Sequence, residues 1–167
     1  MVWSPPTTHG FKLNFDGAAR GGVAASGGII KTHMGALIAA YVDNLNGHSS
    51  NQAESMALSW GTHFSLTMGI GSMNIEGDSK LIIDVVKGRN RLNWTIEGTI
   101  RDTLRIIFGL NSFKFMHVFR EGNGVADAPA SLGLNISSIR CWRSQNSLSD
   151  NINFLLHGEK SKISIDD

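Results

Sequence analysis

Apolar and polar residues follow two different repeats along this chain, one typical of strands and one typical of helices. Leu13 and Phe15 alternate with polar neighbours, a period of two that predicts a strand with one strongly apolar face. Apolar residues with helical spacing fill the segment Ser50–Met68, and a second helical repeat runs over Trp94–Phe108. The glycines at 69–71 end the first of these helices. The pattern therefore predicts a protein that mixes strands and helices.

The predicted elements follow an order that defines a fold class. They are strands at Lys12–Asp16, Gly28–His33 and Ala36–Val42, a helix at Ser50–Met68, a strand at Ser72–Glu76, helices at Ser79–Lys87 and Trp94–Phe108, a strand at Phe113–Arg120, and a helix from near Asn123 to about Leu132. The small residues of Gly17–Gly28 are typical of a turn. Short links favour antiparallel neighbours, whereas helical crossovers favour parallel ones. We therefore expect an α/β fold, with a mixed five-stranded sheet flanked by helices.

Size and composition place the chain among ordinary globular proteins. Its 167 residues are 41% hydrophobic and 17% charged, which suits one domain with a buried core. We expect an extended lead-in over residues 1–11, the domain over 12–133, and a tail over 134–167 that either docks a short helix or is loose. A net charge of +1 gives no electrostatic argument for nucleic acid as a partner.

Cysteine content and hydropathy bear on the compartment. Cys141 is the one cysteine and cannot form an internal disulfide, and no basic segment followed by an apolar one suggests a signal peptide. The longest apolar stretches are far too short to cross a membrane. We expect an intracellular protein with no membrane contact, in the nucleus or the cytoplasm.

Four acidic residues stand at the ends of predicted elements, and each has an ordinary structural explanation. Asp16 could initiate a turn, and Glu54 could complete a helix-capping box with Asn51. Asp78 could cap the following helix, and Asp127 could interact with a helix dipole. Glu76 lies two residues before Asp78, so it would share a strand face with it, and only geometry can exclude it from a site.

The combination of the four points to a metal site. Crowded carboxylates repel one another, and their pKa values rise unless a cation neutralises them. Oxygen ligands without a set of Cys or His residues favour Mg²⁺ or Mn²⁺ over zinc. Two such ions roughly 4 Å apart can drive an in-line attack of water on a phosphodiester.

The segments that carry these residues resemble a known family. They are Lys12-Leu13-Asn14-Phe15-Asp16-Gly17, Ser50-Asn51-Gln52-Ala53-Glu54, Ile75-Glu76-Gly77-Asp78-Ser79 and Asn123-x-x-Ala126-Asp127. Together they resemble type 1 ribonuclease H, especially its plant and archaeal-like members and the ribonuclease-H-like domains of plant non-LTR retrotransposons. The resemblance implies the ribonuclease H fold from about Lys12 to Gly133.

The same resemblance implies an activity and a set of ligands. The expected activity is endonucleolytic cleavage of the RNA strand of RNA–DNA hybrids, with Mg²⁺ as cofactor, Mn²⁺ as a substitute and 5′-phosphate products. Asp16, Glu54, Asp78 and Asp127 would be catalytic and hold the metal ions. The reverse transcriptase of the same polyprotein is a further expected partner.

Six residues match positions where the family contacts its substrate. They are Gly17, Ser50, Asn51, Gln52, Ser79 and Asn123. Contacts to 2′-hydroxyls in the minor groove are how a protein distinguishes RNA from DNA. For the residues at 50–52, ordinary helix capping is an equally good explanation.

The chain also departs from the family. It has no room for the histidine-bearing loop that the family uses before its last helix, and Arg120 is our candidate for that role, with an ion pair to Glu121 or another carboxylate as the alternative. His117 falls on a predicted strand, where a packed or surface role is favoured. Pro129 stands where the family has leucine, so the last helix should begin later or kink. The turn at 21–24 and the absence of a basic, tryptophan-bearing handle differ as well.

Two other functions fit the same segments. A catalytically decayed module could keep the fold and bind nucleic acid or a protein partner without cleaving. A 3′–5′ exonuclease on the same fold is disfavoured, because Asn14 occupies the position where such enzymes carry a first-strand acidic partner for Asp16.

Overall fold

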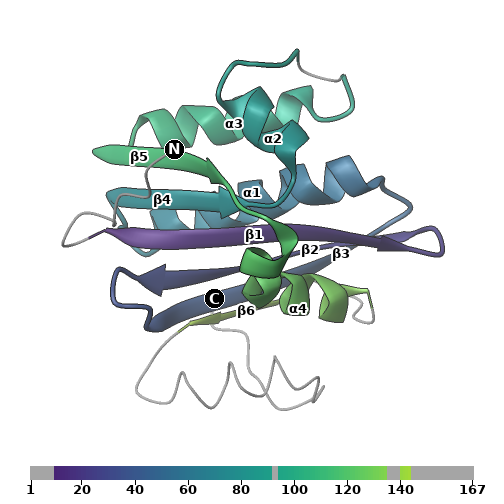
Figure 1. The fold of residues 1–167 in the computed structure, drawn as a ribbon, viewed down its shortest axis with the longest axis horizontal. Coiled ribbons are helices and arrows are strands. Elements are labelled where there is room, and N and C mark those ends of the chain that lie inside the picture. Colours follow the sequence, from purple (N-terminus) through teal and green to yellow (C-terminus); the bar gives the residue numbers. More distant parts are fainter. Residues whose placement is uncertain (1–9, 92–93, 135–139, 144–167) are drawn as a thin grey trace.

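The computed structural model describes residues 10–91, 94–134 and 140–143. The strands are β1 (Phe11–Arg20), β2 (Val23–Thr32), β3 (Leu37–Asn46), β4 (Ser72–Gly77), β5 (Ser112–His117) and β6 (Arg140–Arg143). The helices are α1 (Ser50–Thr67), α2 (Lys80–Val86), α3 (Glu97–Phe108), the 3₁₀ turn η1 (Arg120–Asn123) and α4 (Gly124–Gly133). In one mixed sheet the strands lie in the order β5-β4-β1-β2-β3-β6 (Figure 1). The predicted α/β fold class is confirmed, and all five predicted strands are present.

β1 and β2 form a tight hairpin that is longer than the sequence predicts. Gly21 and Gly22, with φ of 58° and 80°, connect Arg20 to its partner Val23. A two-residue turn of this kind needs positive φ at both positions, which glycine adopts without strain. The predicted turn over Gly17–Gly28 is therefore wrong, because its small residues extend both strands. Asp16 lies within β1 and not at its end.

Helices cover both faces of the sheet, as Figure 1 shows for α1 and α4. α1 packs on β1 and β2 and also contacts α3, whereas α4 packs on β1, β2 and β3 from the other side. The main core, between the sheet and α1 to α3, contains Leu13, Phe15 and Tyr41, all fully buried. The Tyr41 hydroxyl donates a hydrogen bond of 2.5 Å to the carbonyl of Ala57, which ties α1 to β3.

On the opposite face, α4 approaches the sheet very closely. A Cβ on Gly27 of β2 would lie 2.3 Å from the nitrogen of Ala130, so only glycine allows this contact. Pro129 lies inside α4, which begins at Gly124 and not after the proline. The expectation of a later start is therefore wrong. Proline removes one backbone donor from this helix, and the adjacent helix backbone packs against Gly27.

The two ends of the domain also differ from expectation. Arg140–Arg143 adds the strand β6, antiparallel to β3, so the sheet extends beyond the predicted boundary at 133. Phe11 already belongs to β1 and not to a lead-in. The remainder of the predicted lead-in and tail, at 1–9, 135–139 and 144–167, lies outside the described residues.

The predicted helix Trp94–Phe108 begins later than expected. α3 starts at Glu97, and Trp94 is 84% exposed. Trp60 of α1 is partly buried against the core and donates a hydrogen bond of 2.9 Å to Asp43. No helix in the part of the chain that the structure describes is long and apolar enough to cross a membrane.

Candidate active site

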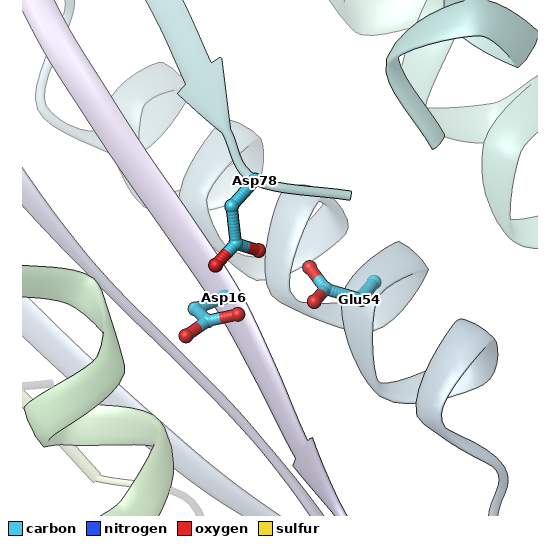
Figure 2. A group of neighbouring side chains, drawn as sticks. All are labelled: Asp16, Glu54 and Asp78. Carbon is cyan, nitrogen blue, oxygen red and sulfur yellow. The ribbon is translucent and has the colours of Figure 1, made fainter. Parts of the chain in front are cut away.

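Three carboxylates from distant parts of the sequence meet at one point. Asp16 comes from β1, Glu54 from the first turns of α1, and Asp78 from the end of β4. One oxygen atom from each lies within 4.8 Å of the other two. Figure 2 shows the three carboxyl groups pointing toward one another. This acidic cluster contains three of the four predicted metal ligands.

Strand register brings Asp16 and Asp78 together. β1 and β4 are parallel, and their last paired residues are Phe15 and Gly77. Asp16 and Asp78 are the next residue on each strand, so both leave the ladder where the two strands part. A crevice beyond the carboxyl end of a parallel strand, where the strand order reverses, is where open α/β sheets place their ligands.

A glycine brings Glu54 to the same point. A Cβ on Gly17 would lie 2.6 Å from the nitrogen of Glu54 and 2.8 Å from the carbonyl carbon of Ala53. The start of α1 can therefore rest directly on β1. The Gly17 amide donates a hydrogen bond of 2.9 Å to Asp16 Oδ1. The structure thus gives Gly17 a packing role in the acidic cluster, whereas the family resemblance implied a substrate contact.

We expect the substitution Gly17→Ala to separate Glu54 from Asp16. The added methyl group must displace backbone, and overpacking of this kind costs about 1–3 kcal/mol. A thermal melt should show a lower Tm, by about 2–4 °C for each kcal/mol lost, and a Mn²⁺ titration should show weaker binding. Gly47→Ala is the matched control, because a Cβ there meets nothing within 4 Å. Equal behaviour of the two variants would contradict the packing role.

Helix capping is performed by neighbouring serines, which leaves two of the carboxylates available. Ser49 caps α1 and forms a capping box with Gln52, in which the Ser49 amide donates to Gln52 Oε1 at 2.8 Å. Ser79 caps α2 by accepting from the Ile82 amide at 3.3 Å. The ordinary explanations for Glu54 and Asp78 are therefore excluded. The Gln52 side chain performs capping, one of the two roles considered for it.

The electrostatics of the acidic cluster are those of a site built for a cation. Burial, with the charges of Asp16 and Asp78 and a hydrogen bond from Asp16 adding to it, raises the pKa of Glu54 from 4.5 to about 10. Glu54 Oε2 and Asp78 Oδ2 are buried and have no hydrogen-bond partner. Buried acceptors without partners are costly. Oxygen ligands of this kind fit Mg²⁺ or another hard divalent cation, which would neutralise the repulsion.

A pH dependence follows for the metal-free protein. Glu54 titrates near 4.5 in the unfolded chain and at about 10 in the folded one, so the folded state binds the extra proton between these values. The contribution of Glu54 to stability is therefore fully present below pH 4.5 and is lost as the pH rises toward 10. We expect the Tm in EDTA to fall across this range, and Glu54→Gln to flatten the profile and raise the Tm at pH 8. A Tm profile that is unchanged by Glu54→Gln would contradict this assignment.

Glu76 is buried but belongs to a separate hydrogen-bonded network. Its Oε1 pairs with Lys12 Nζ at 3.0 Å, and its Oε2 accepts a hydrogen bond of 3.0 Å from Asn14 Nδ2. It is not part of the acidic cluster. Asn14 occupies the position at which exonucleases of this fold are expected to carry an acidic residue. Its side chain donates a hydrogen bond to Glu76. Because an amide is neutral, Asn14 adds no negative charge near Asp16.

Asn123 belongs to the same hydrogen-bonded network as Asn14 and Glu76. It is fully buried, and its Nδ2 donates a hydrogen bond of 2.9 Å to the carbonyl of Phe15. Its Oδ1 lies 3.3 Å from Asn14 Nδ2. The implied role in substrate binding is corrected by this burial: Asn123 fastens the start of α4 to β1 beside Asp16.

A hollow of about 260 Å³ opens next to the acidic cluster. Its lining residues are Ser50, Asn51, Glu54, Asp78, Ser79, His117, Phe119 and Arg120. Four candidates from the sequence, Ser50, Asn51, Ser79 and Arg120, thus border the space beside the carboxylates. His117 and Phe119 also border it. The sequence pattern favoured a packed or surface role for His117 and did not select Phe119.

Arg120 and His117 approach Asp78 in different ways. The Arg120 side chain is 87% exposed, and its Nε lies 3.9 Å from Asp78 Oδ2. That distance is too long for a hydrogen bond, so the guanidinium can turn to another anion. Arg120 begins η1 and does not end a strand as expected. His117 Nε2 contacts the backbone carbonyl of Asp78 at 3.1 Å, which gives it a rim position rather than a packed one.

Asp127, the fourth predicted ligand, lies on α4, which packs against β1. Its side chain is outside what the structure describes. Its membership of the metal site therefore stays a prediction. Asn123, immediately before α4, donates a hydrogen bond to the carbonyl of Phe15, the residue before Asp16. The start of α4 therefore lies near Asp16, as the prediction requires.

The fold and the acidic cluster define a protein of the ribonuclease-H-like class. Residues 14–133 match the family model described as "Reverse transcriptase-like". The chain belongs to this family. Its relatives are named as ribonuclease H proteins.

Two curated relatives carry the ribonuclease H name. An Arabidopsis thaliana protein named "Putative ribonuclease H protein" is 27% identical over 81% of this chain. Ribonuclease HI of Halobacterium salinarum is 31% identical over 72% of this chain. The chain spans 22% of the length of the first and 62% of the length of the second.

Solved structures show the same fold. The crystal structure of ribonuclease H1 from Halobacterium salinarum superposes with a TM-score of 0.71 and 27% identity, covering 75% of this chain and 98% of that one. LC11-RNase H1, crystallised in complex with an RNA/DNA hybrid, gives a TM-score of 0.69 at 21% identity, covering 75% and 96% of the two chains.

Proposed function

We propose that this domain cleaves the RNA strand of RNA–DNA hybrids in a reaction that depends on Mg²⁺, with Mn²⁺ as a substitute. The observation that carries the proposal is the acidic cluster of Asp16, Glu54 and Asp78 at the edge of a hollow in the surface. The names of the two relatives support it, as does the hybrid bound to LC11-RNase H1. A divalent ion bound there supplies the Lewis acidity that activates water and stabilises the leaving oxygen.

Individual side chains would bind the metal ion, the sugar and the phosphate. Asp16, Glu54 and Asp78 offer the oxygen ligands, and Asp127 is proposed to complete the set. Ser50 and Asn51 border the hollow with hydroxyl and amide groups, which suit a sugar 2′-hydroxyl. The charge of Arg120 is placed to meet a phosphate beside the carboxylates.

We further propose that the domain works within a larger retroelement polyprotein of plant origin, next to a reverse transcriptase. The family description and the longer Arabidopsis relative, of which the chain spans 22%, support this setting. A hybrid produced by reverse transcription would be the substrate, in the nucleus or the cytoplasm. Co-purification of the domain with the polymerase segment of its own polyprotein would test it.

The cleavage assay distinguishes this proposal from a decayed module that only binds. Purified protein with Mg²⁺ should cut a labelled RNA–DNA hybrid within the RNA strand and leave 5′-phosphate ends. Duplex DNA of the same sequence should remain intact, and EDTA should stop the reaction because it removes the cation that would activate water and stabilise the leaving oxygen. Hybrid binding without any cleavage would favour the decayed module, and equal cleavage in EDTA would exclude metal-dependent chemistry.

A further inference from the structure

Phe119 is an exposed aromatic residue at the edge of the proposed active site. It lies between β5 and η1, and 78% of its surface is open to solvent. It borders the same hollow as Asp78 and Arg120. The other large exposed apolar residues of the described chain, Met34, Leu66, Trp94, Phe108 and Phe113, do not line this hollow.

The backbone around Phe119 is anchored on both sides. The amide of Val118 donates a hydrogen bond of 3.0 Å to the carbonyl of Gly77, next to Asp78. The amide of Gly122 donates one of 2.9 Å to the carbonyl of Phe119 itself. This segment therefore holds Phe119 at a fixed place relative to the end of β4, where the carboxylates meet.

His117 supports the ring from one side. The two rings lie 5.7 Å apart at 76°, an edge-to-face arrangement, and the His117 ring is itself held by its contact with the Asp78 carbonyl. Aromatic pairs favour this geometry. A large part of the Phe119 ring remains uncovered, beside a hollow whose other lining residues are polar or charged.

The neighbours of Phe119 indicate what would cover it. A phosphodiester at the acidic cluster would place its flanking nucleotide in the hollow, between Ser50 and Asn51 on one element and Phe119 and Arg120 on another. An aromatic ring beside an arginine is a combination that proteins use along nucleic-acid strands. The bases of a hybrid are paired and stacked, so the group that the ring meets is the sugar.

We propose that Phe119 is a substrate-contact residue that packs on the sugar of the nucleotide next to the cleaved phosphodiester, with His117 holding its ring in place. This inference rests on the proposed function, because it takes the acidic cluster as the point of cleavage. It adds a specific contact to that function. Phe119 would contribute to binding of the hybrid and not to the chemical step.

The test compares Phe119→Ala with Phe119→Tyr and with Phe108→Ala. Phe108 is also exposed, at 62%, but lies at the end of α3 away from the hollow, so it is a matched control. Phe119→Ala removes the apolar surface that the ring would bury against the sugar, so we expect it to raise KM for the hybrid about tenfold, which corresponds to about 1.4 kcal/mol. We expect kcat and Tm to stay within error, Phe119→Tyr to keep the wild-type KM, and Phe108→Ala to have no effect.

A binding measurement separates failure of this inference from failure of the proposed function. Fluorescence anisotropy with a labelled hybrid reports affinity whether or not cleavage occurs. A wild-type protein that binds but does not cleave would exclude the nuclease, and a roughly tenfold weaker complex for Phe119→Ala would still support the contact. Equal affinity of wild type and Phe119→Ala, or an equal loss in Phe108→Ala, would overturn the contact. A wild-type protein that binds no hybrid would overturn both.

Discussion

Asp16→Asn is expected to lower the rate of hybrid cleavage by about three orders of magnitude. A metal ion contributes several kcal/mol to transition-state stabilisation, and each 1.36 kcal/mol is about a factor of ten. Asp16 is one of the three carboxylates of the acidic cluster and follows the last residue of β1 that pairs with β4, and no other described carboxylate joins the cluster. Steady-state rates with Mg²⁺ on a labelled hybrid would measure the loss.

The control for this substitution is Glu76→Gln. Glu76 is buried near the end of β4 and is paired with Lys12 and Asn14. Its carboxylate is therefore engaged in that network and is not expected to bind the metal. The glutamine can still accept the hydrogen bond from Asn14, and cleavage should stay within a few fold of wild type. If Glu76→Gln abolished cleavage and Asp16→Asn did not, the metal site would have been assigned to the wrong residues.

Arg120→Ala is expected to lower turnover of the hybrid by about one to two orders of magnitude, the scale of losing one charged stabiliser. The guanidinium is highly exposed and stands 3.9 Å from Asp78, so little folding energy depends on it. A guanidinium group offers hydrogen-bond donors and no acceptor, so we expect this side chain to stabilise phosphate or to assist product release. The Tm should therefore change little.

Arg105→Ala provides the comparison for Arg120→Ala. Arg105 is similarly exposed, at 80%, and pairs with Asp102 on α3, away from the hollow. Its removal should leave turnover unchanged. A loss of turnover in Arg120→Ala that follows a loss of Tm, or that Arg105→Ala shares, would make Arg120 a structural ion-pair residue.

The fold was predictable because most of its elements have a clear hydrophobic repeat. The alternation around Leu13 and Phe15 and the helical spacing in α1 survive in the structure because both bury their apolar faces in one core. The hairpin was not predictable, because the small residues that extend β1 and β2 past Asp16 have turn-like composition. β6 has only four residues, too few to show a hydrophobic repeat that would predict a strand.

The sequence was enough to select the three carboxylates that cluster, but not to show how they are arranged. The sequence predicted Asp16 at the end of one strand and Asp78 between another strand and a helix, but only the register shows that both follow the last paired residues of β1 and β4. Asn123 shares a motif with Asp127, and nothing in that motif reveals that its side chain is buried against Phe15. Phe119 was missed because it fell inside the predicted strand Phe113–Arg120, where an aromatic residue is more often core than contact surface.

Asp16, Glu54 and Asp78 are proposed to hold the divalent cation on which cleavage depends. Anomalous diffraction from crystals soaked in Mn²⁺ can locate the ion by its own scattering. We expect an anomalous peak among the three carboxylates, and its disappearance in Glu54→Gln or Asp16→Asn crystals. Absence of the peak at saturating Mn²⁺, or a peak elsewhere on the protein alone, would contradict it.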